Sequence, residues 1–123
     1  MTILSLNHYT VRTADWERSR RFYEEVVGLT AGERPPFDFP GHWLYAADGN
    51  PVLHLVGDRQ AGGTGGAAID HIAFLCRDFD EVADRLRRLA VPFEQRLVPR
   101  DGMRQIFLHD PDGVRLELNF PAV

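Results

Sequence analysis

Hydrophobic and polar side chains along the start of the chain predict a strand followed by an amphipathic helix. Residues 6–11 alternate between polar and apolar positions, which is typical of a half-buried strand. Asp15 offers a side chain suited to capping a helix, and apolar residues recur near helical spacing over 16–27. Gly28 follows as a stop signal, because glycine readily adopts the left-handed conformation that ends many helices.

Two further strands and a flexible break follow this helix. Strands are predicted at 42–46 and 51–56, and Asp48-Gly49 between them is a hairpin signal. The segment 35–41 is rich in proline and predicts a loop. Residues 57–66 are rich in glycine, which packs poorly and carries much chain entropy, so this segment predicts a flexible linker.

After the linker, the same order of patterns begins again. The sequence predicts a strand, a helix capped by Asp78 and three more strands, at 69–76, 79–90, 93–98, 103–109 and 115–120. This order matches the first half closely enough to suggest a repeated unit.

One constant spacing links the two halves. Three pairs of residues are each 63 positions apart: His8 and His71, Asp15 and Asp78, and His54 and Glu117. One such pair would mean little, but three in register favour an internal duplication. We therefore predict a single α+β domain made of two βαβββ modules, residues 1–57 and 67–123.

Composition and charge narrow the range of functions. The chain has 123 residues, 44% of them hydrophobic, which suits one globular domain. The formal net charge of −4 argues against a nucleic-acid partner, because phosphate binding needs a clustered basic surface. The single cysteine, Cys76, excludes an internal disulfide. There is neither a signal-peptide pattern nor an apolar run of about 20 residues, so we expect a soluble cytoplasmic protein with no membrane partner.

The duplication places four side chains of metal-ligand type at equivalent positions. His8 and His71 fall on the first strand of each module, and His54 and Glu117 fall on the last. Each taken alone also fits a solvated strand face or a satisfied core position, and the shared spacing is what favours a metal. Such ligands suit divalent Fe(II), Mn, Ni, Co or Zn. We predict one divalent metal ion held by these four residues.

Four segments also carry a family resemblance: LNHYTV at 6–11, RFYEEVVGL at 21–29, IDHIAF at 69–74 and DPDGVRLEL at 110–118. They resemble the vicinal oxygen chelate superfamily, which includes glyoxalase I, extradiol dioxygenases, and fosfomycin-resistance and bleomycin-resistance proteins. The resemblance covers nearly the whole chain. It implies a cupped mixed sheet, formed by the paired modules around a metal.

The resemblance also bears on the individual residues. It places His8, His71 and Glu117 on the ligand positions shared by many metal-using members. His54 falls where glyoxalase I usually has a glutamate ligand, and where extradiol enzymes carry a histidine used in proton transfer. Phe107 stands where extradiol enzymes carry a tyrosine. His54 is therefore either a fourth ligand or a general base, and we predict His54 and Glu117 as the catalytic residues.

The resemblance implies a metal-dependent lyase, isomerase or dioxygenase whose small substrate chelates the metal through neighbouring oxygens. One alternative is a fosfomycin-type thiol transferase or hydrolase. Another is a metal-free drug-binding protein like the bleomycin-resistance members. The complete set of two histidines and a glutamate favours the metal-dependent classes.

Other side chains are weaker candidates. His42 is expected to be exposed near a loop and His109 to cap the turn after it, and neither matches a counterpart in the repeat, so both are excluded as ligands. An anionic substrate could be bound by Arg12, Arg96, Arg100, Arg104 or Arg115, although surface charge explains each as well. A pocket could be lined by Phe37, Phe39, Trp43 and Phe107, although core packing explains them equally well.

The assembly is predicted to be a homodimer with two equivalent metal sites. Each βαβββ module has a sheet too small to stand alone and must bury one face against another module. The flexible linker allows two packings: the modules of one chain pair with each other, or each pairs with the opposite module of a second chain. In the swapped form, His8 and His54 come from one chain and His71 and Glu117 from the other.

Overall fold

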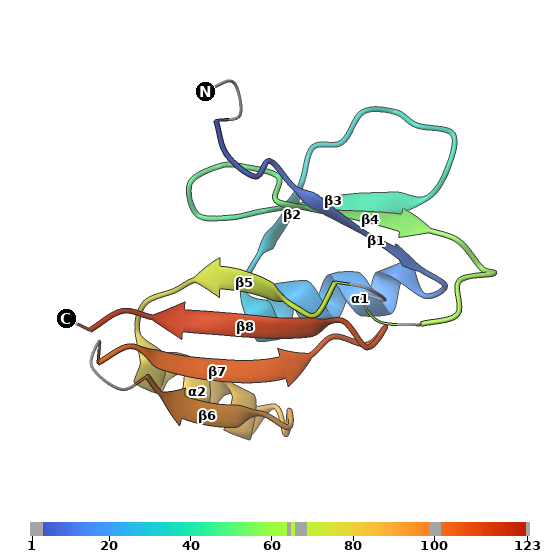
Figure 1. Cartoon of the computed structure of the whole chain (residues 1–123). Coiled ribbons are helices and arrows are strands. Elements are labelled where there is room, and N and C mark those ends of the chain that lie inside the picture. Colours follow the sequence, from blue (N-terminus) through green and yellow to red (C-terminus); the bar gives the residue numbers. More distant parts are fainter. Residues whose placement is uncertain (1–3, 64, 66–68, 99–101, 123) are drawn as a thin grey trace. The chain divides into compact units, whose positions relative to one another are not determined.

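The computed structural model describes residues 4–63, 65, 69–98 and 102–122 (Figure 1). The chain divides into two compact units, Met1–Gly63 and Thr64–Val123. The boundary falls within the predicted linker 57–66, of which residues 64 and 66 lie outside the described residues. That the two units form one domain stays a prediction. Across the described segments, no helix is long and apolar enough to cross a membrane.

The first unit is a four-stranded mixed sheet with one helix. Its elements are β1 (Tyr9–Thr13), α1 (Trp16–Phe22), a π-helical turn η1 (Tyr23–Val27), β2 (Thr30–Gly32), β3 (Gly41–Tyr45) and β4 (Leu53–Gly57). The strand order is β1-β4-β3-β2 (Figure 1). β1 runs parallel to β4, and the other neighbours are antiparallel.

The second unit repeats this topology. Its elements are β5 (Ile72–Leu75), α2 (Phe79–Arg88), β6 (Glu94–Leu97), β7 (Arg104–His109) and β8 (Arg115–Phe120). The strand order is β5-β8-β7-β6, and β5 runs parallel to β8. Both units are therefore βαβββ modules, which confirms the predicted α+β class.

The register of the strands supports the duplication. Tyr9 pairs with Leu53 in the first unit, and Ile72 pairs with Leu116 in the second, so both parallel ladders keep the spacing of 63. The register between the last two strands is shifted by one residue in one unit relative to the other. His54 lies opposite Trp43, whereas Glu117 lies opposite Phe107. An aromatic residue thus faces each candidate ligand of the last strand.

The predicted helix boundaries hold in part. The Asp15 side chain accepts a hydrogen bond from the Arg18 amide at 3.0 Å, and Gly28 ends the helix with φ 99°. Asp78 occupies the equivalent position before α2 but makes no side-chain cap bond, because its backbone is left-handed with φ 64°. The capping role predicted for Asp78 is therefore wrong. The helix predicted over 16–27 is α-helical only to Phe22, and its last five residues, Tyr23–Val27, form the π-helical turn.

Strand β2 was not predicted from the sequence. It has only three residues, Thr30–Gly32, and none of them is buried, so no alternation of polar and apolar positions marks it. Its counterpart β6 lies in the predicted strand 93–98. The repeat was therefore the one signal that could have pointed to a strand here.

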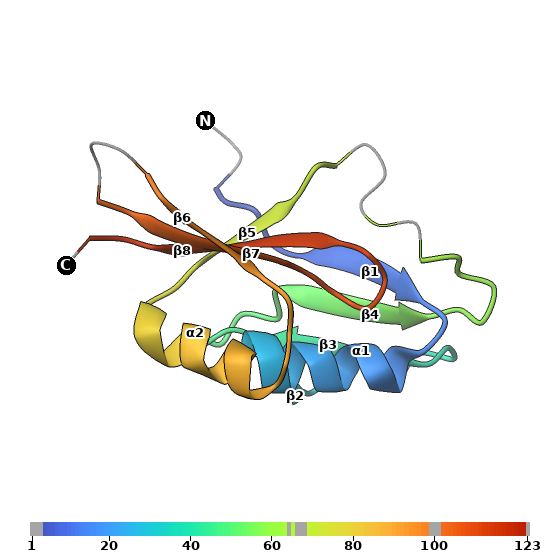
Figure 2. The same ribbon diagram turned by 90° about the horizontal axis from the view of Figure 1, so that it is seen from below.

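Side-chain alternation puts a core on one face of each sheet and leaves the other face open. In β8, Leu116, Leu118 and Phe120 are buried while Arg115, Glu117 and Asn119 are half-buried. The apolar face meets α2, where the Phe79 ring packs edge-on against Phe120 at 5.1 Å. In the first unit, Leu44, Leu53 and Leu55 are buried on the side of α1. Figure 2 shows each helix against one face of its own sheet.

Leu53→Ala and Leu116→Ala should each lower the free energy of unfolding by about 2–5 kcal/mol, since truncating a buried leucine leaves a cavity. Both side chains are fully buried, at equivalent positions of the repeat. Urea unfolding followed by circular dichroism measures the change. Leu97→Ala is the control: Leu97 is 63% exposed, and its loss should cost less than about 0.5 kcal/mol. A cost below about 1 kcal/mol at Leu53 or Leu116 would contradict the assigned core.

Candidate metal centre

In the first unit, the two candidate histidines are held by ring stacking. His8 lies one residue before β1, and His54 lies in β4, the strand parallel to β1. Their rings stack with centroids 3.7 Å apart and an interplanar angle of 15°. Trp43 of β3 stacks on His54 at 4.0 Å and 9°. His54 is thus common to both stacking contacts, which fix its ring plane.

One nitrogen of His54 is buried without a partner. Among the described residues, no group forms a hydrogen bond with Nε2 of His54. Burial lowers the pKa of His54, and the nearby His8 lowers it further. The ring is therefore held neutral, the form in which imidazole binds a metal. An unpaired buried nitrogen is costly unless a ligand completes it.

In the second unit, the candidate ligands His71 and Glu117 lie close together. Nε2 of His71 is 3.6 Å from Oε1 of Glu117. The other carboxylate oxygen of Glu117 accepts a hydrogen bond at 2.8 Å from the side-chain amide of Asn119. The Gln105 amide in turn donates to the Asn119 carbonyl oxygen at 3.0 Å. This chain of amides orients the Glu117 carboxylate on the open face of the sheet.

His8 and His71 each lie one residue before the first strand of their unit rather than in it, and the residue before each histidine fixes its ring. Nδ1 of His8 lies 2.7 Å from Oδ1 of Asn7, and Nδ1 of His71 lies 2.8 Å from Oδ2 of Asp70. In both rings Nδ1 donates, which makes Nε2 the nitrogen with a lone pair for a metal. The hydrogen bond from His71, together with Arg115, lowers the pKa of Asp70. Asn7 and Asp70 are equivalent in the repeat, and sequence reasoning missed both of these roles.

Each unit taken by itself therefore presents one pair of candidate ligands. Within the part of the chain that the structure describes, no group of three or more His, Cys, Asp or Glu side chains is gathered closely enough to hold a metal. The available nitrogens of His8, His54 and His71 and the oriented carboxylate of Glu117 fit a divalent ion chemically. The four-residue metal site stays a prediction.

The two excluded histidines have other partners or surroundings. His42 lies in β3, half-buried, with Nε2 2.6 Å from a carboxylate oxygen of Glu17 in α1. The hydrogen bond from His42 is the largest cause of the lowered pKa of Glu17. His42 was predicted to be exposed, which is wrong, because strand alternation turns its side chain toward the helix. His109 does not close the turn after it; the Asp110 side chain does, accepting from the amides of Asp112 and Val114.

The candidate arginines separate into two groups. Arg12 pairs with Asp58 at 3.5 Å, and Arg104 pairs with Asp80 at 3.8 Å. Arg100 lies outside the described residues. Arg96 and Arg115 both place a guanidinium near the Phe107 ring, with centroid distances of 5.9 and 4.5 Å. Phe107 lies opposite Glu117, so both guanidinium groups lie over the ring that faces a candidate ligand, although Arg115 also pairs with Asp70 at 3.4 Å.

Comparison with known proteins decides the family. The model of the Glyoxalase/Bleomycin resistance protein/Dioxygenase superfamily matches residues 5–118. This chain belongs to that family. The resemblance drawn from the four sequence segments is thereby confirmed.

Curated relatives in the glyoxalase family include enzymes of different reaction types. The metallothiol transferase FosB of Lysinibacillus sphaericus (strain C3-41) is 32% identical, over 97% of this chain and 84% of that protein. The mitochondrial methylmalonyl-CoA epimerase of Bos taurus is 30% identical, over 92% of this chain and 72% of that protein. Family membership therefore does not select one reaction.

Solved structures of the glyoxalase family agree with the fold. A glyoxalase family protein from Bacillus anthracis has a TM-score of 0.82 at 21% identity, covering 99% of this chain and 98% of that one. TnmS3, an antibiotic binding protein from Streptomyces sp. CB03234, has a TM-score of 0.74 at 22% identity, covering 99% of both chains. At these identities, the likeness bears on the fold alone.

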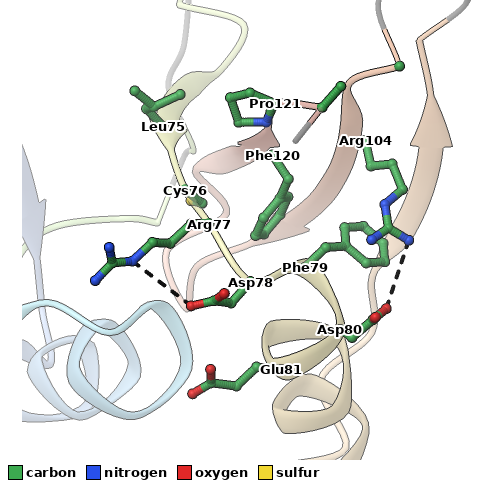
Figure 3. A pocket seen from close by; sticks show the side chains of 12 residues that line it. Leu75, Cys76, Arg77, Asp78, Phe79, Asp80, Glu81, Arg104, Phe120 and Pro121 are labelled. Carbon is green, nitrogen blue, oxygen red and sulfur yellow. Dashed lines mark ion pairs between the residues drawn. The ribbon is translucent and has the colours of Figure 1, made fainter.

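A pocket of about 820 Å³ in the second unit of this glyoxalase family member lies away from the candidate ligands His71 and Glu117 (Figure 3). It is formed where β5 and β8 end and α2 begins, and its lining includes Cys76, Phe79 and Phe120. Ion pairs join Arg77 to Asp78 at 3.9 Å and Arg104 to Asp80 at 3.8 Å (Figure 3). Neither His71 nor Glu117 lines it. Burial raises the pKa of the Cys76 thiol, which keeps it a poor nucleophile.

Proposed function

We propose that this protein is a metal-dependent enzyme whose small substrate chelates the metal through neighbouring oxygens. His8, His71 and Glu117 would be the protein ligands, and His54 would be either a fourth ligand or a general base. The observation that supports this most is the symmetry of the two pairs. Equivalent histidines in both units are fixed by the residue before them, with Nε2 available for coordination.

The bound metal would polarise two substrate oxygens and stabilise negative charge that develops on them. The chain itself supplies orientation and proton transfer. Asn7 and Asp70 would hold the two histidine rings, and Asn119 would hold the Glu117 carboxylate. His54, kept neutral and planar against Trp43, is placed to accept a proton at Nε2 if it is not a ligand. The known members with glyoxalase, epimerase or dioxygenase activity are consistent with chemistry of this class.

A fosfomycin-type thiol transferase or hydrolase is the second candidate. Arg96 and Arg115, whose guanidinium groups lie near the Phe107 ring, favour it, because guanidinium groups bind phosphonate oxygens well. Similarity to the metallothiol transferase FosB and to the glutathione transferase FosA of Serratia marcescens, both 32% identical, points the same way. A metal-free drug-binding protein is the third candidate, and the paired histidines and the oriented glutamate argue against it.

We further propose a cytoplasmic homodimer formed by a single two-module domain. The free Cys76 agrees with a reducing compartment. Each described sheet has two edge strands, β1 and β2 in the first unit and β5 and β6 in the second, each paired on one side within its own unit, and such edges are commonly paired or covered.

The three candidates are separated by metal analysis followed by a substrate panel. The purified protein is loaded in turn with Mn(II), Fe(II), Ni(II), Co(II) and Zn(II). It is then offered a thiol adduct of methylglyoxal, a catechol, and fosfomycin with a thiol or with water, in air and without oxygen. We expect turnover of one substrate that is lost on chelation and regained with metal. Tight fosfomycin or bleomycin binding with neither metal nor turnover would sink the enzymatic proposal.

A further inference from the structure

A row of aromatic side chains extends from His54 into the loop between β2 and β3. Trp43 stacks on His54, and the Phe37 ring lies 6.4 Å from Trp43. Phe37 stacks on Phe39 with centroids 4.9 Å apart and an interplanar angle of 15°. These two phenylalanines are 44% and 39% exposed. Their exposure is unusual for a core contact, so they are available to contact a ligand.

A pocket of about 510 Å³ opens beside this row. It is lined by Glu33, Arg34, Pro35, Trp43 and Tyr45. The size is in the range of small-molecule sites. We call it the loop pocket.

The walls of the loop pocket are fixed in advance. The Tyr45 hydroxyl donates a hydrogen bond to the Glu33 carbonyl oxygen at 2.7 Å. The Tyr45 ring lies against Gly32 of β2, where an added Cβ would come within 2.8 Å of a ring carbon. Glycine at this position is therefore what lets the ring lie flat. Flat, preformed aromatic walls favour a flat ligand, since little ordering is needed on binding.

Arg34 gives the loop pocket a positive charge. Its guanidinium lies 5.1 Å from the Phe37 ring centroid and 5.0 Å from that of Phe39. One nitrogen donates to the Phe39 carbonyl oxygen at 2.7 Å. No carboxylate pairs with Arg34 among the described residues, whereas Arg12 and Arg115 both have acidic partners. The remaining N–H groups are free to bind an anion. Glu33, which also lines the pocket, is exposed.

We propose that the loop pocket binds an aromatic carboxylate, with the ring against Trp43 and Tyr45 and the carboxylate on Arg34. This inference rests on the proposed function in one respect: the ligand of the loop pocket is the part of the proposed metal-chelating substrate that lies farthest from the metal. A neutral aromatic group would leave the Arg34 donors unused. An aliphatic carboxylate would gain little from the flat walls.

Three small probes test this: benzoate, cyclohexanecarboxylate and benzamide. They are titrated by calorimetry into the full-length protein as purified and after chelation, so that binding to a metal is separated from binding to the loop pocket. We expect a dissociation constant for benzoate of about 0.1–1 mM, which is reasonable for nine non-hydrogen atoms. Cyclohexanecarboxylate, with the same charge but a saturated, puckered ring, should bind at least about 5-fold more weakly.

Variants separate charge from shape. Arg34→Gln should weaken benzoate about 10-fold and leave benzamide unchanged, and Arg34→Lys should restore most of the benzoate affinity. Trp43→Leu should weaken both aromatic probes. Arg59→Gln is the matched control, because Arg59 also lies over a tryptophan, at 5.0 Å from the Trp16 ring, but does not line the loop pocket. Thermal unfolding checks that each variant is folded.

Equal affinity for benzoate and cyclohexanecarboxylate would overturn the inference, as would identical effects of Arg34→Gln and Arg59→Gln. If Arg34→Gln fails to fold, Trp43→Leu still decides it, because this change should weaken benzoate and benzamide and largely spare cyclohexanecarboxylate; equal effects on all three probes would contradict the inference. Failure of the proposed function is distinguishable. The protein would then bind no metal while the chelated protein still showed the benzoate preference.

Discussion

Exchanging Glu117 for glutamine should lower the affinity for a divalent metal at least about 100-fold and abolish turnover. The amide keeps the shape of the side chain and its hydrogen bond with Asn119, so the sheet should remain folded while the anionic ligand is lost. Competition with a chromophoric chelator measures the affinity. His71→Ala should have an effect of similar size, because it removes the partner whose Nε2 lies 3.6 Å from the carboxylate.

Two exposed residues of the same unit serve as matched controls. Glu94→Gln alters a carboxylate opposite the same Phe107, and His109→Ala removes an imidazole from the neighbouring strand. Both should bind metal like the unmodified protein. If Glu94→Gln proved as damaging as Glu117→Gln, the effect would reflect the charge of the sheet rather than ligation.

Acid should release the metal through the same groups. Neutral imidazole binds a metal and imidazolium does not, so affinity should fall as the pH drops below about 6. The lowered pKa of His54 means that this ring stays neutral to a lower pH than an ordinary imidazole. Retention of metal unchanged down to about pH 4 would contradict histidine ligation.

Mixing two inactive variants should restore about one quarter of the metal sites if the dimer is swapped. His8→Ala chains and Glu117→Ala chains each lack one ligand. In a swapped pair of unlike chains, one site receives His8 and His54 from one chain and His71 and Glu117 from the other, and is complete. Half of the randomly reassociated dimers are such pairs, and each has one intact site of two. Metal content after unfolding and refolding together is the measurement.

An unswapped dimer gives no recovery, since every site still lacks a ligand. Combining His8→Ala with His54→Ala chains is the control. Both changes fall in the first unit, so no exchange of units between chains rebuilds a complete site. A monomer in sedimentation that nonetheless holds metal would overturn the dimer itself.

The sequence predicted the strands and repeat positions that follow from hydrophobic periodicity and from the spacing of residues. Strands β4 and β8 alternate buried and half-buried positions, which is a pattern readable in the residues themselves. The spacing of 63 predicted the equivalence of His8 and His71, and both parallel ladders keep that spacing. The topology of both modules followed from the repeat together with the family resemblance.

What escaped prediction depends on three-dimensional contacts. Strand β2 is too short and too exposed to show a pattern. The hydrogen bonds from His8 to Asn7 and from His71 to Asp70 join adjacent residues, yet nothing in the sequence says that a side chain turns back on its neighbour. The stacking of Trp43 on His54 depends on the register of β3 against β4, which differs by one from the register of β7 against β8.

The π-helical turn Tyr23–Val27 bears on how the two copies diverged. The turn is closed by a hydrogen bond from the Gly28 amide to the Tyr23 carbonyl oxygen, five residues back, which accommodates one residue more than an α-helical turn. The corresponding end of the second helix is left-handed at Ala90, with φ 57°, so the helix ends are 62 rather than 63 positions apart. The segment up to the helix end is thus one residue longer in the first unit than in the second, and the connections that follow return the spacing to 63 at β4 and β8. The two units therefore differ in length between the strands that carry the candidate ligands, while the spacing of those strands is the same in both.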